Sequence, residues 1–274
     1  MLHGRRGRVP LFGPLSGLVP LHGSSSVNVT RPARVTKTVA LSGRVSAQRG
    51  PAPRREWGVD VESAYPEHVA LLQGVEAGAF GSGPFFWFDE LAQVTNMLTP
   101  TESTLGGATW TGGVLGGAGT TADGTRFLFS RNADAGIAVT LTDRLAVPPE
   151  YPVTASVYVS THPTASATLQ VREWNVEGAI IATHSDIVPA DSYAHRAAVT
   201  FTTSPFTASL SFDVISPLMV TMPAVTLTDR PLPWGTGQGC RQAIVETSGY
   251  SVRKAVAHPN GRRIGYGITI HELG

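Results

Sequence analysis

The sequence has little cysteine, little charge and no long apolar run. Cys240 is the only cysteine among 274 residues, so no disulfide can form within the chain, and the small disulfide-stapled class of secreted domains is excluded. Charged residues make up 15% of the chain, below the roughly 25% typical of soluble domains. No stretch reaches the ~18 to 20 apolar residues that a membrane span needs. We therefore expect stability from packing and assembly, without membrane insertion.

Catalytic motifs are also missing. The eight histidines are scattered singly, and the sequence contains neither an HExxH zinc motif nor a GxSxG nucleophile motif. The glycine-rich residues 78–83 follow a predicted helix and precede a predicted strand, the reverse of a phosphate-binding loop. Asp60 and Glu62 share one face of a predicted strand and could serve a glycosidase, but exposed strand acids are far commoner. We expect a protein that is not an enzyme and has no cofactor or metal.

The residues that are abundant indicate a mainly β protein. Glycine (30) and proline (20) are frequent, and short runs of Val, Thr, Ile and aromatic residues alternate with turn residues. Residues 27–61 alternate as the strands of a meander. Ser63 is a candidate cap for one short helix that Pro66 enters and Gly78 ends. The aromatic run 85–88 then predicts a buried strand.

The character of the chain changes near residue 97, where glycine-rich turns and short strands begin. The strands recur every 8 to 12 residues or so, as in a β-sandwich, and the proline- and glycine-rich connector PLPWGTGQGC follows them. We therefore predict an inserted jelly-roll-like sandwich over residues 97–233.

The C-terminal residues predict a hairpin with a turn at Pro259-Asn260-Gly261. A lone hairpin is marginal in water, so we expect it to dock on the N-terminal strands. Residues 27–96 together with 234–274 would then form one split β-rich domain, and residues 1–26 an N-terminal arm.

Charge is distributed unevenly along the chain. Residues 1–55 hold ten Lys or Arg and no acid, whereas residues 56–95 hold seven acids and no base. Residues 96–240 have a net charge of −5, and the two flanking parts net +3 each. This favours the split domain, although solvated faces that differ by chance would give the same counts. For the basic segment we favour contacts with neighbouring subunits over phosphate contacts.

Three stretches carry a family resemblance. The sequence WGVDVESAYPEHVALLQGVEAGAFGSGPFFWFDELAQVTNMLTP, the sandwich end AVTLTDRPLPW and the terminal ITIHELG resemble minor tail proteins of long-tailed actinobacterial phages, in particular distal tail proteins. The resemblance covers most of the chain beyond residue 27. It rests on the order of these features and carries no catalytic signature.

The resemblance implies a fold, partners and a location. The split domain would be a tail-tube-like β-barrel or sandwich with one short helix, which forms a ring, with a hexamer favoured. The ring would join the tail tube protein to other tail-tip proteins at the distal end of the virion tail, after assembly in the host cytoplasm. The genome would pass through its lumen without sequence recognition. The inserted sandwich would be similar to carbohydrate-binding modules and contact host cell-wall glycan.

The candidate glycan-binding residues of the sandwich are Trp110, Trp174 and Tyr193, because aromatic rings stack on sugars. Core packing is the alternative for both tryptophans. A structural calcium ion is a further hypothesis, with three aspartates as its ligands, Asp123, Asp213 and Asp229. The alternative function is a free carbohydrate-binding module or the accessory domain of a glycan-active protein.

Overall fold

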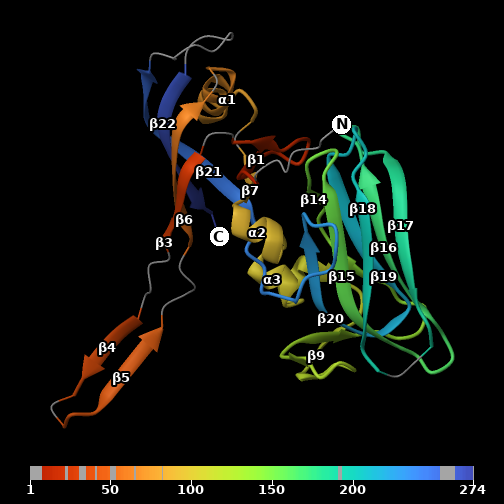
Figure 1. Ribbon diagram of the computed structural model, residues 1–274. Helices are drawn as coiled ribbons and strands as arrows, with labels where there is room; N and C mark the ends of the chain where they lie inside the picture. Colours follow the sequence, from red (N-terminus) through yellow and green to blue (C-terminus); the bar gives the residue numbers. More distant parts are fainter. Residues whose placement is uncertain are drawn as a thin grey trace. The chain divides into compact units, whose positions relative to one another are not determined.

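The computed structural model confirms a mainly β chain (Figure 1). It describes residues 8–21, 24–30, 35–40, 42–49, 54–64, 66–81, 83–190, 193–253 and 263–273. They form two compact units, one of residues 1–20 with 86–241 and one of residues 21–85 with 242–274. The predicted boundaries near 97 and 233 stay predictions. No helix in the described ranges is long and apolar enough to cross a bilayer.

The second unit is built on an antiparallel sheet. Its strands are β3 (Ser24–Thr30), β6 (Glu56–Ala64), β21 (Cys240–Arg253) and β22 (Arg263–Glu272), in the order β21-β22-β6-β3. Because β22 pairs with β6, the terminal strands dock on the N-terminal ones, as expected. Trp57, Val59 and Val61 of β6 are buried, whereas Asp60 and Glu62, which each follow one of the valines, are exposed. The turn predicted at 259–261 lies outside the described residues.

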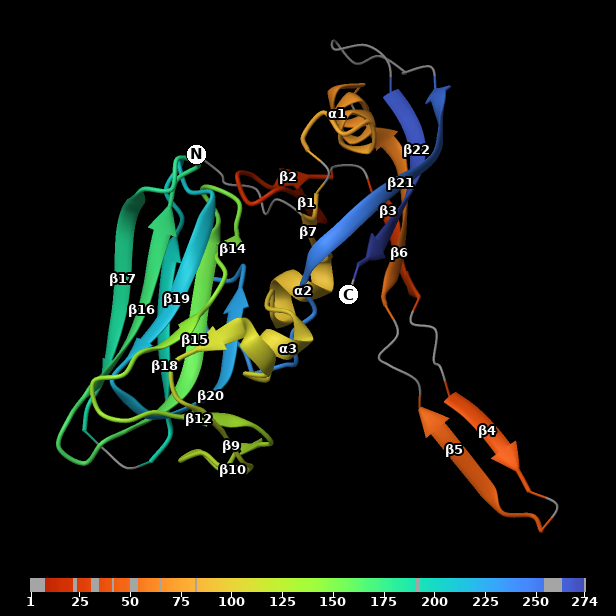
Figure 2. The ribbon, with the colours of Figure 1, turned by 180° about the vertical axis from the view of Figure 1, so that it is seen from behind.

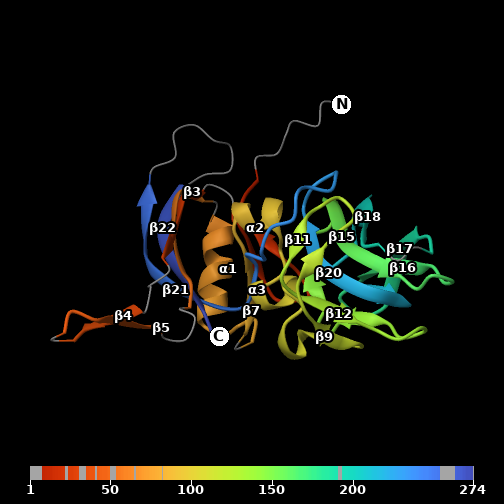
Figure 3. The same cartoon turned by 90° about the horizontal axis from the view of Figure 1, so that it is seen from below.

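The expected helix is α1 (Pro66–Glu76), which packs on β22 (Figure 3). It begins at Pro66, and Ser63, the candidate cap, lies in strand β6. Beyond the helix Gly78 adopts a φ of 78°, a left-handed conformation that favours glycine. Two further short helices, α2 (Glu90–Thr95) and α3 (Pro100–Ser103), were not predicted.

A separate hairpin consists of β4 (Val35–Val39) and β5 (Val45–Arg49) (Figure 2). Within the described ranges these two strands pair only with each other. Val39 lies opposite Val45 in the register, and the two residues are 66% and 61% exposed. Two-stranded hairpins without a covering surface are marginally stable in water. This hairpin therefore presents apolar side chains that nothing in the described chain buries.

Residues near the N-terminus differ from the predicted arm. Strand β1 (Leu11–Gly13) pairs with both β2 (Val19–Pro20) and β7 (Phe85–Phe88), and Leu11 and Phe12 are each 1% exposed. Residues 8–20 of the predicted arm are therefore packed within the first unit. The reason is that the apolar side chains of this segment are buried more favourably than they could be in an exposed arm.

The first unit contains the β-sandwich (Figure 1). One sheet has the order β18-β15-β20-β12-β9, and the other has the order β17-β16-β19-β13-β8, with β14 (Leu145–Ala146) pairing with β19. The bounds of the first sheet are β9 (Val114–Gly116), β12 (Ser130–Asn132), β15 (Pro152–Thr161), β18 (His195–Thr202) and β20 (Pro217–Thr226). Those of the second are β8 (Trp110–Thr111), β13 (Val139–Leu141), β16 (Ala167–Trp174), β17 (Ile180–Val188) and β19 (Ser209–Ile215).

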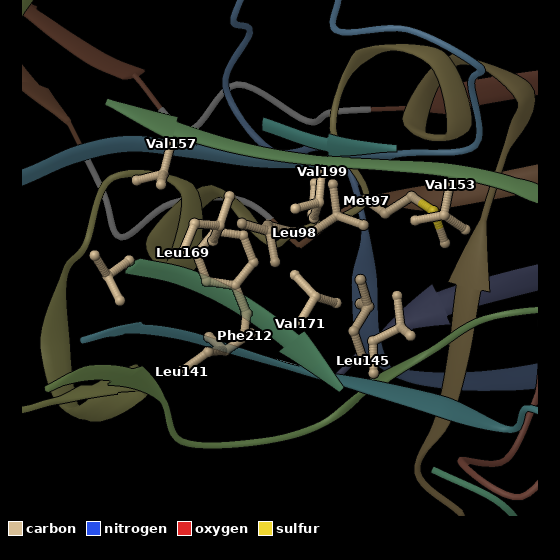
Figure 4. Packing of buried hydrophobic residues seen from close by; sticks show 14 of the residues in the cluster. Met97, Leu98, Leu141, Leu145, Val153, Val157, Leu169, Val171, Val199 and Phe212 are labelled. Atoms are coloured by element: carbon tan, nitrogen blue, oxygen red, sulfur yellow. The ribbon is translucent and has the colours of Figure 1, made fainter. Parts of the chain in front are cut away.

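The sandwich core lies between the two sheets (Figure 4). Alternate residues of β15, such as Val153 and Val157, face Leu169 and Val171 of β16 and Phe212 of β19. The alternation follows from the twofold period of a strand. Every other side chain of β15 therefore points to the outer face of its sheet.

Buried Asn96 anchors the residues that precede the sandwich. Its Nδ2 donates to the carbonyl oxygens of Pro223 (3.0 Å) and Gly235 (3.1 Å). Its Oδ1 accepts from the backbone N–H groups of Leu98 (3.1 Å) and Val225 (3.2 Å). The amide thus satisfies its hydrogen-bonding groups inside the protein and ties the chain before the sandwich to the chain after it.

Candidate functional site

Of the three predicted aromatic residues, Trp110 lies inside the core. It is 2% exposed, its Nε1 donates to the carbonyl oxygen of Glu102 at 2.8 Å, and its ring meets Phe212 edge to face at 5.6 Å between centroids. A buried ring offers no face to a ligand from solvent. Trp110 therefore serves core packing, the alternative that the sequence left open.

Trp174 is partly exposed at the end of β16. Its Nε1 donates to Ser211 Oγ at 3.0 Å, and the guanidinium of Arg144 lies 4.9 Å from its ring centroid. Arg144 thus covers part of the ring by a cation–π contact, which leaves less of it for a sugar.

Tyr193 is 66% exposed, just before β18. It follows the end of β17, where Val188 pairs with Ala167 at the start of β16. Trp174 is at the other end of β16, so Trp174 and Tyr193 lie at opposite ends of these strands. The structure does not bring the three predicted residues together.

Two of the three aspartates proposed for calcium have contacts within the protein, and the third, Asp229, is exposed. Asp213 is paired with Arg172 at 3.0 Å, and Asp123 binds polar groups of the protein. Across the part of the chain that the structure describes, no three His, Cys, Asp or Glu side chains gather in a way that could hold a metal ion. The calcium hypothesis therefore has no supporting geometry there.

A shallow depression lies on the outer face of the sheet that contains β15 and β18. Its volume is about 320 Å³, and its lining consists of Ala122, Asp123, Tyr158, Ala194, His195 and Arg196. Of these residues, only Asp123 was predicted to bind a ligand, and that ligand was calcium. One sequence signal could have pointed to this site. Tyr158 is the one aromatic residue at the outward-facing positions of β15, where Thr154, Ser156 and Ser160 are small and polar.

Strand register brings the two sides of the depression together. Because Val157 and Val159 of β15 face the core, Tyr158 points outward, and the β15–β18 register places Arg196 opposite it. Tyr158 packs into a small cluster with Phe127, Ala194 and Met222, against which Trp234 also rests. The floor of the depression is therefore held by packing.

Asp123 belongs to a turn between β10 (Gly119–Thr120) and β11 (Arg126–Phe127). Its Oδ1 accepts from Thr121 Oγ1 (2.5 Å) and from the backbone N–H of Thr125 (3.1 Å), and its Oδ2 accepts from the Tyr158 hydroxyl (2.7 Å). These hydrogen bonds, that from Thr121 most strongly, hold the pKa of Asp123 far below its ordinary value. The carboxylate is thus ionised at neutral pH and fixed in position.

Arg196 closes the opposite side of the depression. Its Nη2 donates to Ser156 Oγ at 3.0 Å and to the carbonyl oxygen of Leu232, and its guanidinium lies 5.9 Å from the Tyr158 ring centroid. Burial, followed by the hydrogen bond to Asp123, raises the pKa of Tyr158. The site therefore combines a fixed anion, a fixed cation and a neutral phenol.

Comparisons with known proteins give only distant structural similarities. No protein-family model matches the sequence, and no curated protein matches it. Solved structures similar to the chain include the enzymatically active domain of tailspike protein 4 from bacteriophage CBA120, at 12% identity and a TM-score of 0.37, covering 48% of this chain and 21% of that one. They also include a carbohydrate-binding module of Cellvibrio mixtus lichenase 5A in complex with cellotriose, at 11% identity and a TM-score of 0.31, covering 49% and 99% of the two chains.

A third similar structure is that of the module pair from Clostridium thermocellum xylanase 10B in complex with xylohexaose. The identity is 14% and the TM-score 0.31, over 46% of this chain and 27% of that one. The chain therefore spans about a fifth of the tailspike domain and about a quarter of the xylanase structure. At these scores, function has to be argued from the residues of this chain.

Proposed function

We propose that this chain is a structural, non-catalytic subunit of a phage tail tip. It assembles with copies of itself into a ring, of six subunits by preference, between the tail tube and the tip proteins at the distal end of the virion tail. The observation that carries the proposal is the β4–β5 hairpin, whose exposed Val39 and Val45 need a surface to cover them.

Charge supports a second copy of the chain as that surface. The hairpin and its flanking residues belong to the N-terminal 55 residues, which hold ten bases and no acid. Residues 56–95 hold seven acids and no base. Two of these acids, Asp60 and Glu62, are exposed on β6. Segments of opposite charge on one chain favour self-association and fix its register.

An open sheet edge adds to the argument. Strand β3 is the last in the order β21-β22-β6-β3, and among the described residues its only strand neighbour is β6. An edge strand carries unpaired backbone groups that native proteins cover or pair. A neighbouring subunit that covered this edge would satisfy them.

The assembly proposal is tested by replacing both hairpin valines with serine in the full chain. Sedimentation velocity and light scattering should show an oligomer for the wild type and mainly monomer for Val39→Ser/Val45→Ser. Val114→Ser is the matched control, because Val114 is 69% exposed on β9, outside the hairpin. A wild-type chain that stays monomeric at high concentration would refute the proposal, as would a double variant that assembles normally.

A second function is proposed for the sandwich, which is contact with a glycan of the host surface. The observation that favours it is the depression at Tyr158, with its fixed polar rim. The alternative in which the same sandwich acts as a free carbohydrate-binding module requires a monomer that binds glycan. The sedimentation experiment above therefore separates the ring-forming subunit from the free module.

A further inference from the structure

We infer that the depression lined by Asp123, Tyr158 and Arg196 is a binding site for one neutral pyranose unit of a saccharide. This inference rests on the second proposed function, and it is independent of the assembly proposal. It also moves the site away from Trp110, Trp174 and Tyr193, none of which lines the depression.

The floor of the depression fits the apolar face of a sugar ring. It is formed by exposed Ala122 together with the small exposed parts of Ala194 (5%) and Tyr158 (7%), whose remaining surfaces pack in the cluster below. Side chains as small as alanine leave room above them, and a volume of about 320 Å³ accommodates a single ring. The C–H groups of a pyranose pack on such a floor as other apolar groups do on aromatic and aliphatic side chains.

The rim supplies groups that bind hydroxyls. Asp123 is an exposed residue, and its carboxylate is an acceptor for hydroxyl donors of a ligand. His195, also exposed, lines the same depression and has ring nitrogens that can donate or accept. A ring of several hydroxyls can contact both side chains at once.

The balance of charge favours a neutral ligand. A cation drawn to Asp123 would meet Arg196, and an anion drawn to Arg196 would meet Asp123. In addition, the Arg196 guanidinium is engaged with Ser156 and Leu232, which reduces its capacity to hold an anion. An uncharged molecule with several hydroxyl groups is repelled by neither Arg196 nor Asp123.

The site is ordered before any ligand arrives. The turn that carries Asp123 is fixed by the hydrogen bonds from Thr121, Thr125 and Tyr158. The backbone N–H of Ala122 also donates to the carbonyl oxygen of Ala194 at 3.0 Å, which joins the two sides of the floor. Because the lining needs no ordering, little binding free energy is lost to conformational entropy.

The test is isothermal titration calorimetry of the full chain with glucose, galactose, N-acetylglucosamine, cellotriose and xylohexaose. The wild type should bind at least one of them. Ala122→Phe should abolish that binding, because it fills the depression from an exposed position without removing a buried group. Asp123→Asn should weaken it about tenfold or more, the effect of one charge-assisted hydrogen bond.

The matched control is Asp134→Asn, which removes the same charge from an exposed turn that does not line the depression. It should bind like the wild type, and circular dichroism should show all variants folded. If the wild type binds none of these saccharides, both the second proposed function and this site are overturned. If the wild type and Ala122→Phe bind equally, the site alone is overturned, and glycan binding lies elsewhere on the sandwich.

Discussion

The Oε1 atom of Glu102 lies 2.5 Å from Nε of Arg241, and the two side chains are only 2% and 11% exposed. The other carboxylate oxygen of Glu102 accepts from the backbone N–H of Thr99 at 2.9 Å, within the capping box of α3. Arg241 also donates from Nη1 to the carbonyl oxygen of Arg144 at 2.7 Å. One buried ion pair thus joins three segments of the first unit, namely the helix before the sandwich, a sandwich loop and the chain after the sandwich.

Breaking this pair should destabilise the first unit strongly. Glu102→Gln leaves the guanidinium of Arg241 buried without its counter-ion, and removing one partner of a buried pair costs about 3 to 5 kcal/mol. The measurement is the free energy of unfolding in urea. The control Glu177→Gln makes the same change at an exposed residue of the sandwich and should alter stability by less than about 0.5 kcal/mol. Similar small effects of both changes would contradict the role of the pair.

Two glycines allow a second prediction about the chain that follows the sandwich. A Cβ atom on Gly239 would lie 1.9 Å from the carbonyl oxygen of Met97, whereas one on Gly117 would meet nothing within 4 Å. Gly239→Ala should therefore force the backbone apart and cost about 1 to 3 kcal/mol. Gly117→Ala should be neutral or slightly stabilising. Thermal unfolding of both variants provides the comparison, and equal melting temperatures would show that the two segments are not packed as described.

Replacing Trp110 and replacing Trp174 should lower the stability of the sandwich by different amounts. Trp110→Ala should destabilise the sandwich by about 3 to 5 kcal/mol, because it empties a buried position beside Phe212. Trp174→Ala should cost less, because Trp174 is only partly buried. Urea unfolding measures both. Calorimetry should show that Trp174→Ala binds saccharides like the wild type, and a loss of binding would return the glycan site to Trp174.

The mainly β fold could be predicted because strand alternation is a local property. The pattern Val153, Ala155, Val157, Val159 appears in the sequence itself, and these side chains all lie in the core. Strand β17 shows where this local signal fails. It is an edge strand whose Ile180, Ile181 and Ile187 are exposed, so its residues show no clear apolar and polar alternation.

The depression could not be predicted because it depends on pairs far apart in the chain. Tyr158 meets Asp123 from a turn 35 positions away and Arg196 from the next strand in the sheet. No short sequence motif contains all three of these residues. The N-terminal residues are a second case. Their prolines and basic side chains indicated an arm, yet Leu11 and Phe12 pair with β7 and are buried.

Tyr266 gives a prediction about alkaline pH. It is 7% exposed, and among the described residues no group makes a hydrogen bond to its hydroxyl. Burial raises the pKa of Tyr266 to about 12, above the value of about 10 in an unfolded chain. Because the folded-state pKa is the higher one, the stabilisation is complete below about pH 10 and is lost as the pH rises from there towards 12.

Replacing Tyr266 with phenylalanine should therefore have two effects. Near neutral pH, Tyr266→Phe removes an unpaired buried hydroxyl and should raise the free energy of unfolding by about 1 kcal/mol. Between neutral pH and about pH 11, it should lose less stability than the wild type. Urea unfolding at both pH values gives the readout, and Tyr193→Phe, at a residue that is 66% exposed, is the control. A variant that is less stable than the wild type near neutral pH would show that the hydroxyl has a hydrogen-bond partner after all.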